Sequence, residues 1–127
     1  MKTVLVPIAP GFEEIETITV VDILRRAGAQ VTLAGTEDGP PKGSRGILVL
    51  PDDSLNNIME KYFDMIVLHG GQPGTDNLRK DVRVTQLLKK MNGLRKNIAA
   101  ICAAPLVLMD AEILGNLIYH QPSLSPN

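Results

Sequence analysis

Residues 65–71 read Met-Ile-Val-Leu-His-Gly-Gly, four apolar residues that lead through a histidine into a pair of glycines. A short apolar run of this kind predicts a strand buried on both faces, as in a parallel sheet. Comparable runs occupy residues 3–9, 31–34 and 97–101, and stretches with helical spacing lie between them. Because this alternation is typical of βαβ units, the sequence predicts a single α/β domain with a mostly parallel sheet.

Two stretches have the spacing of an amphipathic helix. Apolar residues recur every three or four positions over residues 20–27, and Gly28 marks the end of that helix. The same spacing runs over residues 82–93 after Asp81, which is a good N-cap. We therefore expect a helix after the first strand and another before the strand at 97–101.

Shorter signals complete the pattern. Ser54 is expected to cap a short helix over residues 55–61, and a proline at position 105 suits the first turn of a helix that runs to about residue 114. Residues 35–46, rich in glycine, proline and charge, predict a loop.

Two further segments give weaker predictions of secondary structure. Residues 47–51 read as a short strand, and the proline at its end suggests a sheet edge. Residues 117–119 are expected to begin one more strand, and the polar, proline-containing residues from about 119 to 127 are expected to form a tail.

The composition excludes several classes of protein. Thirteen Lys and Arg against fourteen Asp and Glu leave a net charge of −1, so no electrostatic footprint for nucleic acid or an anionic membrane is visible. A single cysteine excludes an internal disulfide and a multi-cysteine zinc site. The longest apolar run, residues 98–109, is too short to span a bilayer, and no signal-peptide pattern follows Met1. We therefore expect a cytoplasmic protein that acts on a small ligand.

Cys102 is the first candidate for chemistry because it lies where a predicted strand turns into a predicted helix. The residues around it read Ala-Ile-Cys-Ala-Ala, and such small neighbours permit the sharp turn of a nucleophile elbow. At the N-terminus of a helix, free N–H groups favour the thiolate form of a cysteine. The alternative is a buried, inert cysteine, which is equally consistent with these local features.

Acidic residues follow the first predicted strand. Glu13 and Glu14 suit the start of a helix merely because of its dipole. Glu16 lies further along, between apolar neighbours, and is expected to face the sheet, where its protonated form can donate a hydrogen bond to the sulfur of Cys102.

Glycines and histidines supply weaker signals. Gly70 and Gly71 permit a close approach of the backbone, and their N–H groups are candidates for an oxyanion hole; a tight turn explains them equally well. His69 and His120 are each a candidate base for Cys102, although a plain core or surface role is the safer interpretation of an isolated histidine. Two histidines without a cluster of further ligands do not indicate a metal site.

Taken together, the ordered motifs resemble the ThiJ/PfpI superfamily, and most closely its Parkinson disease deglycase subgroup. The resemblance extends over about residues 1–114, and the matching segments are residues 9–17, 21–22, 25–28, 44–46, 50–52, 64–71 and 99–105. It implies a flavodoxin-like α/β sandwich, usually dimeric, that uses no cofactor.

The resemblance also assigns roles to individual residues. It places the nucleophile at Cys102, its protonated carboxyl partner at Glu16, and the backbone donors to an oxyanion at Gly71 and Ala103, beside Gly70. Where this subgroup usually has a proline, the chain has His69, a titratable ring next to the proposed oxyanion site.

Three other positions carry weaker implications. Arg26 and Arg45, which would otherwise read as solvated charge, resemble positions near a dimer interface that hold an anion. His120 resembles the active-site histidine only loosely, because its spacing from the cysteine and the residue after it both differ.

Members of this superfamily differ in activity. The function implied first is glyoxalase or deglycase action on a small dicarbonyl or a glycated protein. The alternative is a redox-sensing chaperone that acts through oxidation of Cys102. A peptidase ranks last, because that branch has a histidine directly after the cysteine and this chain has Ala103.

The family chain normally continues through another sheet segment and a packing helix. We therefore expect that an apolar face is either hidden in an oligomer, with residues 120–127 lying across a partner, or left open at a cost in stability.

Overall fold

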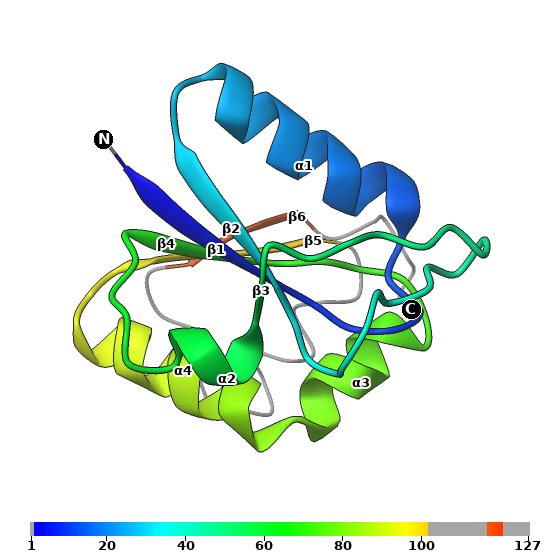
Figure 1. The fold of residues 1–127 in the computed structure, drawn as a ribbon. Coiled ribbons are helices and arrows are strands. Elements are labelled where there is room, and N and C mark those ends of the chain that lie inside the picture. Colours follow the sequence, from blue (N-terminus) through cyan, green and yellow to red (C-terminus); the bar gives the residue numbers. More distant parts are fainter. Residues whose placement is uncertain (1, 102–116, 121–127) are drawn as a thin grey trace, which may run out of the picture.

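The computed structural model describes residues 2–101 and 117–120, which form a layered α/β fold (Figure 1). The elements are β1 (Thr3–Ile8), α1 (Glu14–Arg26), β2 (Gln30–Gly35), β3 (Asp53–Ser54), α2 (Leu55–Ile58), β4 (Met65–Leu68), α3 (Gly74–Lys80), α4 (Val82–Gly93), β5 (Asn97–Ile101) and β6 (Leu117–His120). None of the helices in this described part is long and apolar enough to cross a membrane.

The six strands form one sheet in the order β3-β2-β1-β4-β5-β6, and every neighbouring pair is parallel. Without the two-residue edge strand β3, this is the flavodoxin-like order, and it confirms the predicted fold class. The strand order reverses direction at β1, because β2 lies on one side of β1 and β4 lies on the other. Ligand sites in such sheets lie at this reversal, beyond the carboxyl ends of the strands.

The core has two layers because the strands bury both of their faces. In Figure 1, α1 lies on one side of the sheet, and α2, α3 and α4 lie on the other. Alternate residues of β1 divide between these layers: Val4, Val6 and Ile8 belong to the α1 layer, whereas Leu5 belongs to the opposite one. The apolar runs therefore read as unbroken because each strand serves two layers.

Local signals mark the helix ends as predicted. The Asp81 carboxylate accepts a hydrogen bond from the Arg83 N–H at 2.9 Å, and the Ser54 hydroxyl accepts one from Asn57 N–H at 3.3 Å. Gly28, with a φ of +93°, follows the end of α1. Helix α2 stops at Ile58, earlier than predicted, and α3 was not predicted. The helix expected over residues 105–114 lies outside the described residues.

The predicted strand at residues 47–51 is wrong. That segment contributes only an isolated bridge between Lys42 and Leu48, and the strand beside β2 is formed by the later residues of β3. Ile47 and Leu50 are 55% and 81% exposed, so their apolar character does not serve the sheet. At the other end, β6 confirms the strand predicted at 117–119 and includes His120, a residue assigned above to the tail.

Candidate active site

The carboxyl ends of β1 and β4 bring together two of the segments singled out in the sequence. Backbone hydrogen bonds join them directly: Glu13 N–H donates to the Gly70 carbonyl at 3.2 Å, and Gly74 N–H donates to the Gly11 carbonyl at 3.1 Å. Strand β5 runs parallel to β4 and ends at Ile101, the residue before Cys102 in the sequence. Cys102 and Ala103 themselves lie outside the described residues.

Glycine is required where these two segments touch. Gly71 has a φ of +93°, and a Cβ at this position would lie 2.7 Å from the Glu13 backbone nitrogen. Gly11 has a φ of +86°, and a Cβ there would lie 2.5 Å from Cδ of Pro73. Both residues therefore adopt a conformation that disfavours other side chains, and both permit an approach that a side chain would block.

The Gly71 N–H group has a distinct position in this turn. The Gly71 carbonyl accepts a hydrogen bond from Thr75 N–H at 2.8 Å, whereas the Gly71 N–H is the donor in none of the backbone hydrogen bonds found among the described residues. A backbone donor in that situation is the kind of group that binds an oxyanion.

Glu16 lies in the first turn of α1 and does not project into solvent. Its side chain is half-buried and its Oε1 atom is buried, whereas the neighbouring Ile15 is 76% exposed. Glu13 is the N-cap residue, whose carboxylate accepts a weak hydrogen bond from Ile15 N–H at 3.4 Å. Glu16 is therefore partly buried at the start of α1, Glu13 caps the helix, and the role of Glu16 beside Cys102 stays a prediction.

Glu14 has a role that sequence reasoning missed. It is only 6% exposed, and its carboxylate accepts hydrogen bonds from the Arg45 N–H at 2.8 Å, the Ile47 N–H at 3.2 Å and the Ser44 hydroxyl at 3.3 Å. Burial alone would raise the pKa of Glu14, but hydrogen bonds to its carboxylate outweigh burial and hold the pKa below its ordinary value. Glu14 thereby fastens the turn at residues 44–47 to α1. Its partners lie about thirty residues away, so no local pattern signals this contact.

His69 is a core residue. It is 1% exposed, its Nε2 accepts a hydrogen bond from Ala9 N–H at 3.1 Å, and its Nδ1 lies 2.9 Å from the Gly70 carbonyl oxygen, to which it donates. The ring packs edge-to-face with that of Phe12, with ring centroids 6.0 Å apart. Burial lowers the pKa of His69 to about 4, against the opposing effect of the bond to Gly70. The ring is therefore neutral near pH 7 with both nitrogens engaged, and this geometry favours the core role over that of a base.

Among the described residues, no side-chain contact brings Arg26 or Arg45 to the glycine turn. The Arg26 guanidinium pairs with Asp22 on its own helix at 2.9 Å, and Arg45 is exposed in the turn that Glu14 holds. The register of β6 pairs the backbone of His120 with Ile101, the residue before Cys102. Within the described residues, no group of three or more His, Cys, Asp and Glu side chains could hold a metal ion.

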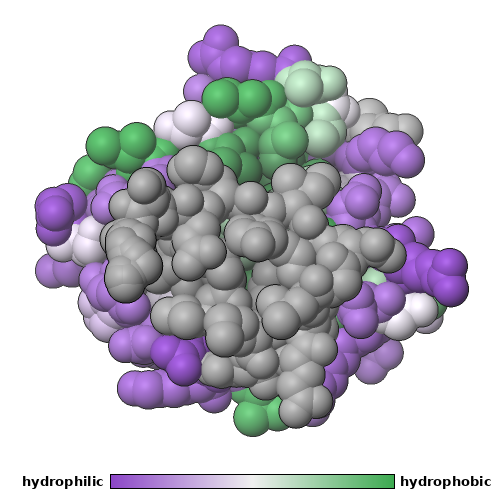
Figure 2. Space-filling view, turned by 180° about the vertical axis from the view of Figure 1, so that it is seen from behind, coloured by the Kyte–Doolittle hydropathy of each residue, from purple (hydrophilic) through white to green (hydrophobic). Residues whose placement is uncertain are grey.

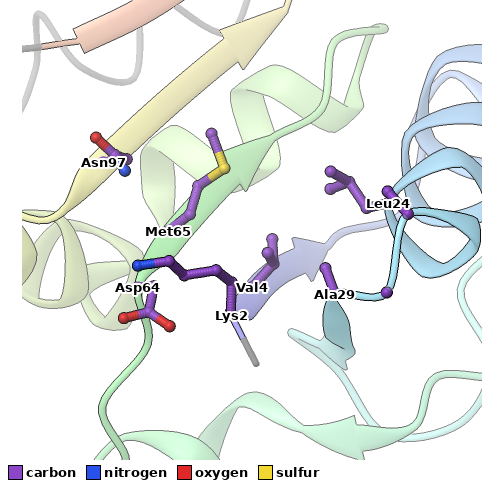
Figure 3. A pocket seen from close by; sticks show the side chains of 9 residues that line it. Lys2, Val4, Leu24, Ala29, Asp64, Met65 and Asn97 are labelled. Carbon is purple, nitrogen blue, oxygen red and sulfur yellow. The ribbon is translucent and has the colours of Figure 1, made fainter.

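A hollow of about 470 Å³ lies at the opposite end of the sheet, near the start of β1 and β4. Figure 3 shows the Lys2 amino group above the Asp64 carboxylate, with Val4 and Met65 forming an apolar wall beside them. The Asp64 carboxylate already accepts hydrogen bonds from the N–H and hydroxyl of Thr3, at 2.8 and 3.2 Å. These hydrogen bonds hold the pKa of Asp64 below its ordinary value, although burial opposes them. We therefore locate the candidate active site at the carboxyl edge and not in this hollow.

Comparison with known proteins gives consistent matches over most of the chain. Residues 2–118 match the model of the DJ-1/PfpI family. Protein dj-1beta of Drosophila melanogaster is 42% identical over 127 residues, covering 98% of this chain and 68% of that protein. Glutathione-independent glyoxalase DJR-1.2 of Caenorhabditis elegans is 40% identical over 112 residues, covering 85% of this chain and 58% of that protein.

Solved structures agree with these matches. Oxidized Toxoplasma gondii DJ-1 superposes with a TM-score of 0.85 and 40% identity, covering 87% of this chain and 61% of that one. The crystal structure of Drosophila melanogaster DJ-1beta gives a TM-score of 0.88 and 35% identity, covering 99% of this chain and 77% of that one. Against the two curated relatives, the chain spans 68% and 58% of the full length.

Proposed function

Because the chain belongs to the DJ-1/PfpI family, in agreement with the resemblance found in its sequence, we propose that it is a cofactor-independent cysteine enzyme of the glyoxalase or deglycase type. Its substrates are small dicarbonyls or their adducts with protein amines. The observation that carries the proposal is the contact between the glycine turn at residues 70–71 and Glu13, the N-cap of α1, at the edge of the sheet where β5 ends one residue before Cys102. Glu16, with a buried Oε1 atom, lies in the first turn of that helix. The glyoxalase named among the relatives, at 40% identity, supports the same reaction class.

The proposed reaction needs a nucleophile, an oxyanion site and a proton carrier. The Cys102 thiolate adds to the aldehyde carbon of methylglyoxal, and the N–H groups of Gly71 and Ala103 bind the resulting oxyanion. The Glu16 carboxyl assists proton movement as the hydrogen on that carbon shifts to the neighbouring carbon, which converts the hemithioacetal into a thioester. Water then cleaves the thioester, so that methylglyoxal and one water give lactate and the free thiol.

Lactate formation tests this proposal. Methylglyoxal is incubated with the protein and lactate is followed by NMR, with Cys102→Ser as the essential variant and Glu16→Gln against Glu13→Gln as a matched pair one turn apart. We expect turnover in the native chain and in Glu13→Gln, and loss of at least a hundredfold in Cys102→Ser, as for removal of a nucleophile. Turnover that is unchanged in Cys102→Ser would overturn the proposal.

The alternative function is redox sensing, and the observation that favours it is the likeness to a solved relative described as oxidized, at 40% identity. In this scheme, two equivalents of peroxide oxidise the Cys102 thiolate to a sulfinate and are themselves reduced to water. The sulfinate oxygens bind the same Gly71, Ala103 and Glu16 groups. Intact mass after mild peroxide treatment separates the schemes, because a gain of two oxygens at Cys102 without dicarbonyl turnover favours the sensor.

A second copy of this chain is the partner we propose. Figure 2 shows hydrophobic side chains gathered along the upper edge of the molecule, over α1. Exposed apolar residues lie on α1 and on the segment at residues 47–50: Ile15, Ile18, Ile23, Ile47, Leu48 and Leu50. A hollow of about 330 Å³ lies between α1 and residues 49–52, so this surface is both apolar and concave.

Light scattering during size-exclusion chromatography tests this pairing. The native chain is expected to have twice the 13.8 kDa mass of one chain. Ile18→Glu should give a monomer, whereas Val82→Glu, an equally drastic change of an exposed residue on α4 on the opposite face, should not. A native monomer, or dissociation by both variants alike, would contradict the assignment of this surface.

A further inference from the structure

We infer that His69 is a positioning residue: it clamps the Gly70 carbonyl so that the Gly71 N–H is held in the orientation that an oxyanion requires. This inference deepens the proposed function and rests on it. It concerns a residue that the sequence marks as a candidate base and as a departure from the proline usual at this position.

The clamp acts through the plane of one peptide. The Gly70 carbonyl accepts two hydrogen bonds, from His69 Nδ1–H at 2.9 Å and from Glu13 N–H at 3.2 Å. The peptide between Gly70 and Gly71 is trans, so its C=O and N–H groups point in opposite directions. Two donors that fix the carbonyl on one side therefore fix the Gly71 N–H on the other.

A clamp is needed because this peptide lies between two glycines. Without a Cβ on either side, the backbone has few steric barriers to rotation of the peptide plane. The Glu13 N–H bond alone, at 3.2 Å, is long for an N–H donor, whereas the imidazole bond at 2.9 Å has the usual length. The side-chain donor is thus the stronger of the two restraints.

The imidazole can act as a clamp because the fold immobilises it. Its far nitrogen, Nε2, accepts from Ala9 N–H just beyond β1, and Phe12 lies against the ring. A ring flip would place a C–H against the Gly70 carbonyl and leave the Ala9 N–H without its acceptor. His69 therefore spans the gap between the end of β1 and the glycine turn, with its proton on Nδ1.

Two variants at position 69 test the hydrogen bonds of the two ring nitrogens separately. Asn at position 69 can place an amide donor where Nδ1 lies but cannot reach Ala9, whereas Gln can offer an acceptor to Ala9 N–H but not the donor at the Nδ1 position. With methylglyoxal as the substrate, we expect kcat of His69→Gln to fall at least tenfold with KM within about twofold of the native value. His69→Asn should keep kcat within about threefold. Equal loss in both variants, or full activity in both, would overturn the inference.

Two further measurements do not depend on turnover. Long-range ¹H–¹⁵N spectra of the native protein should show His69 as the neutral Nδ1–H tautomer at pH 7, and the Nε2–H tautomer would contradict the clamp. A crystal structure of His69→Gln should show a rotated peptide between Gly70 and Gly71, and an unrotated one would contradict it. If the native chain leaves methylglyoxal unchanged, the proposed function fails, while these two results still decide the role of His69.

Discussion

Acidification should destabilise the protein through His69 before the carboxylates contribute. The pKa of this side chain is about 4 in the fold, against 6.5 in an unfolded chain, because burial disfavours the imidazolium. Protonation would also remove the acceptor of Ala9 N–H. The unfolded chain therefore binds more protons than the folded one between pH 6.5 and 4, and the free energy of unfolding falls as the pH is lowered through that window.

The size of the effect follows from the two pKa values. At pH 7 only about a quarter of unfolded chains carry a proton on His69, whereas at pH 5 nearly all do, and roughly a tenth of folded chains do. The difference in proton binding lowers the free energy of unfolding by roughly 2 kcal/mol between pH 7 and pH 5. That loss is a large part of the stability of an ordinary domain.

Between pH 7 and pH 5, the carboxylates with lowered pKa values contribute little to the change in the free energy of unfolding. The pKa values of Glu14, Asp53 and Asp64 are lowered in the fold from 4.5, 3.8 and 3.8, so their contribution is present above those values and is lost mainly below pH 5. The other histidine, His120, is present in the native chain and in a His69→Gln variant alike, so the difference between the two proteins isolates His69.

Urea denaturation followed by circular dichroism at pH 7, 6 and 5 provides the measurement. The native chain should lose roughly 2 kcal/mol more than His69→Gln across the range, with the same dependence on urea concentration. Parallel losses in both proteins would show that His69 is not a buried neutral base, and a native chain that becomes more stable on acidification would refute the sign of the argument.

Three further predictions concern the residues that build the site and its support. Gly71→Ala should cost roughly 2 kcal/mol or more, because the new Cβ meets the Glu13 nitrogen at a positive φ, and thermal unfolding measures the loss. Leu88→Ala should cost about 3 kcal/mol by leaving a cavity in the layer beneath the sheet, an effect that urea denaturation measures and that an unchanged midpoint would contradict. Glu14→Gln should release the turn at 44–47, so that trypsin cleaves after Arg45 faster than in the native chain, while equal cleavage rates would show that the turn holds itself.

Local patterns predicted the frame of the molecule. Apolar runs defined β1, β2, β4 and β5, and the carboxylate of Asp81 marked the start of α4, because each of these signals is contained within a few residues. The segment at residues 47–51 has the same apolar pattern, but it does not form a strand of the sheet. Which segment pairs with β2 depends on the geometry of the whole chain, and there the sequence was a poor guide.

Long-range hydrogen bonds explain what the sequence left open at the site. Glu14 reads as an ordinary helix-start carboxylate until the turn at residues 44–47 folds back onto it. His69 reads as a titratable ring until Ala9, sixty residues earlier, supplies the N–H that engages it. The apolar neighbours of Glu16 do not indicate which side of α1 faces inward, because Ile15 and Ile18 are exposed whereas Glu14 and Thr17 are buried.

A crystal structure of the protein reacted with methylglyoxal tests the central claim most directly. The account predicts a covalent adduct on the Cys102 sulfur, with its oxygen about 2.7–3.1 Å from the Gly71 nitrogen. It also predicts contact between the adduct and the Glu16 carboxyl. An unmodified Cys102, or an adduct whose oxygen points away from Gly71, would contradict the assignment of this edge of the sheet as the active site.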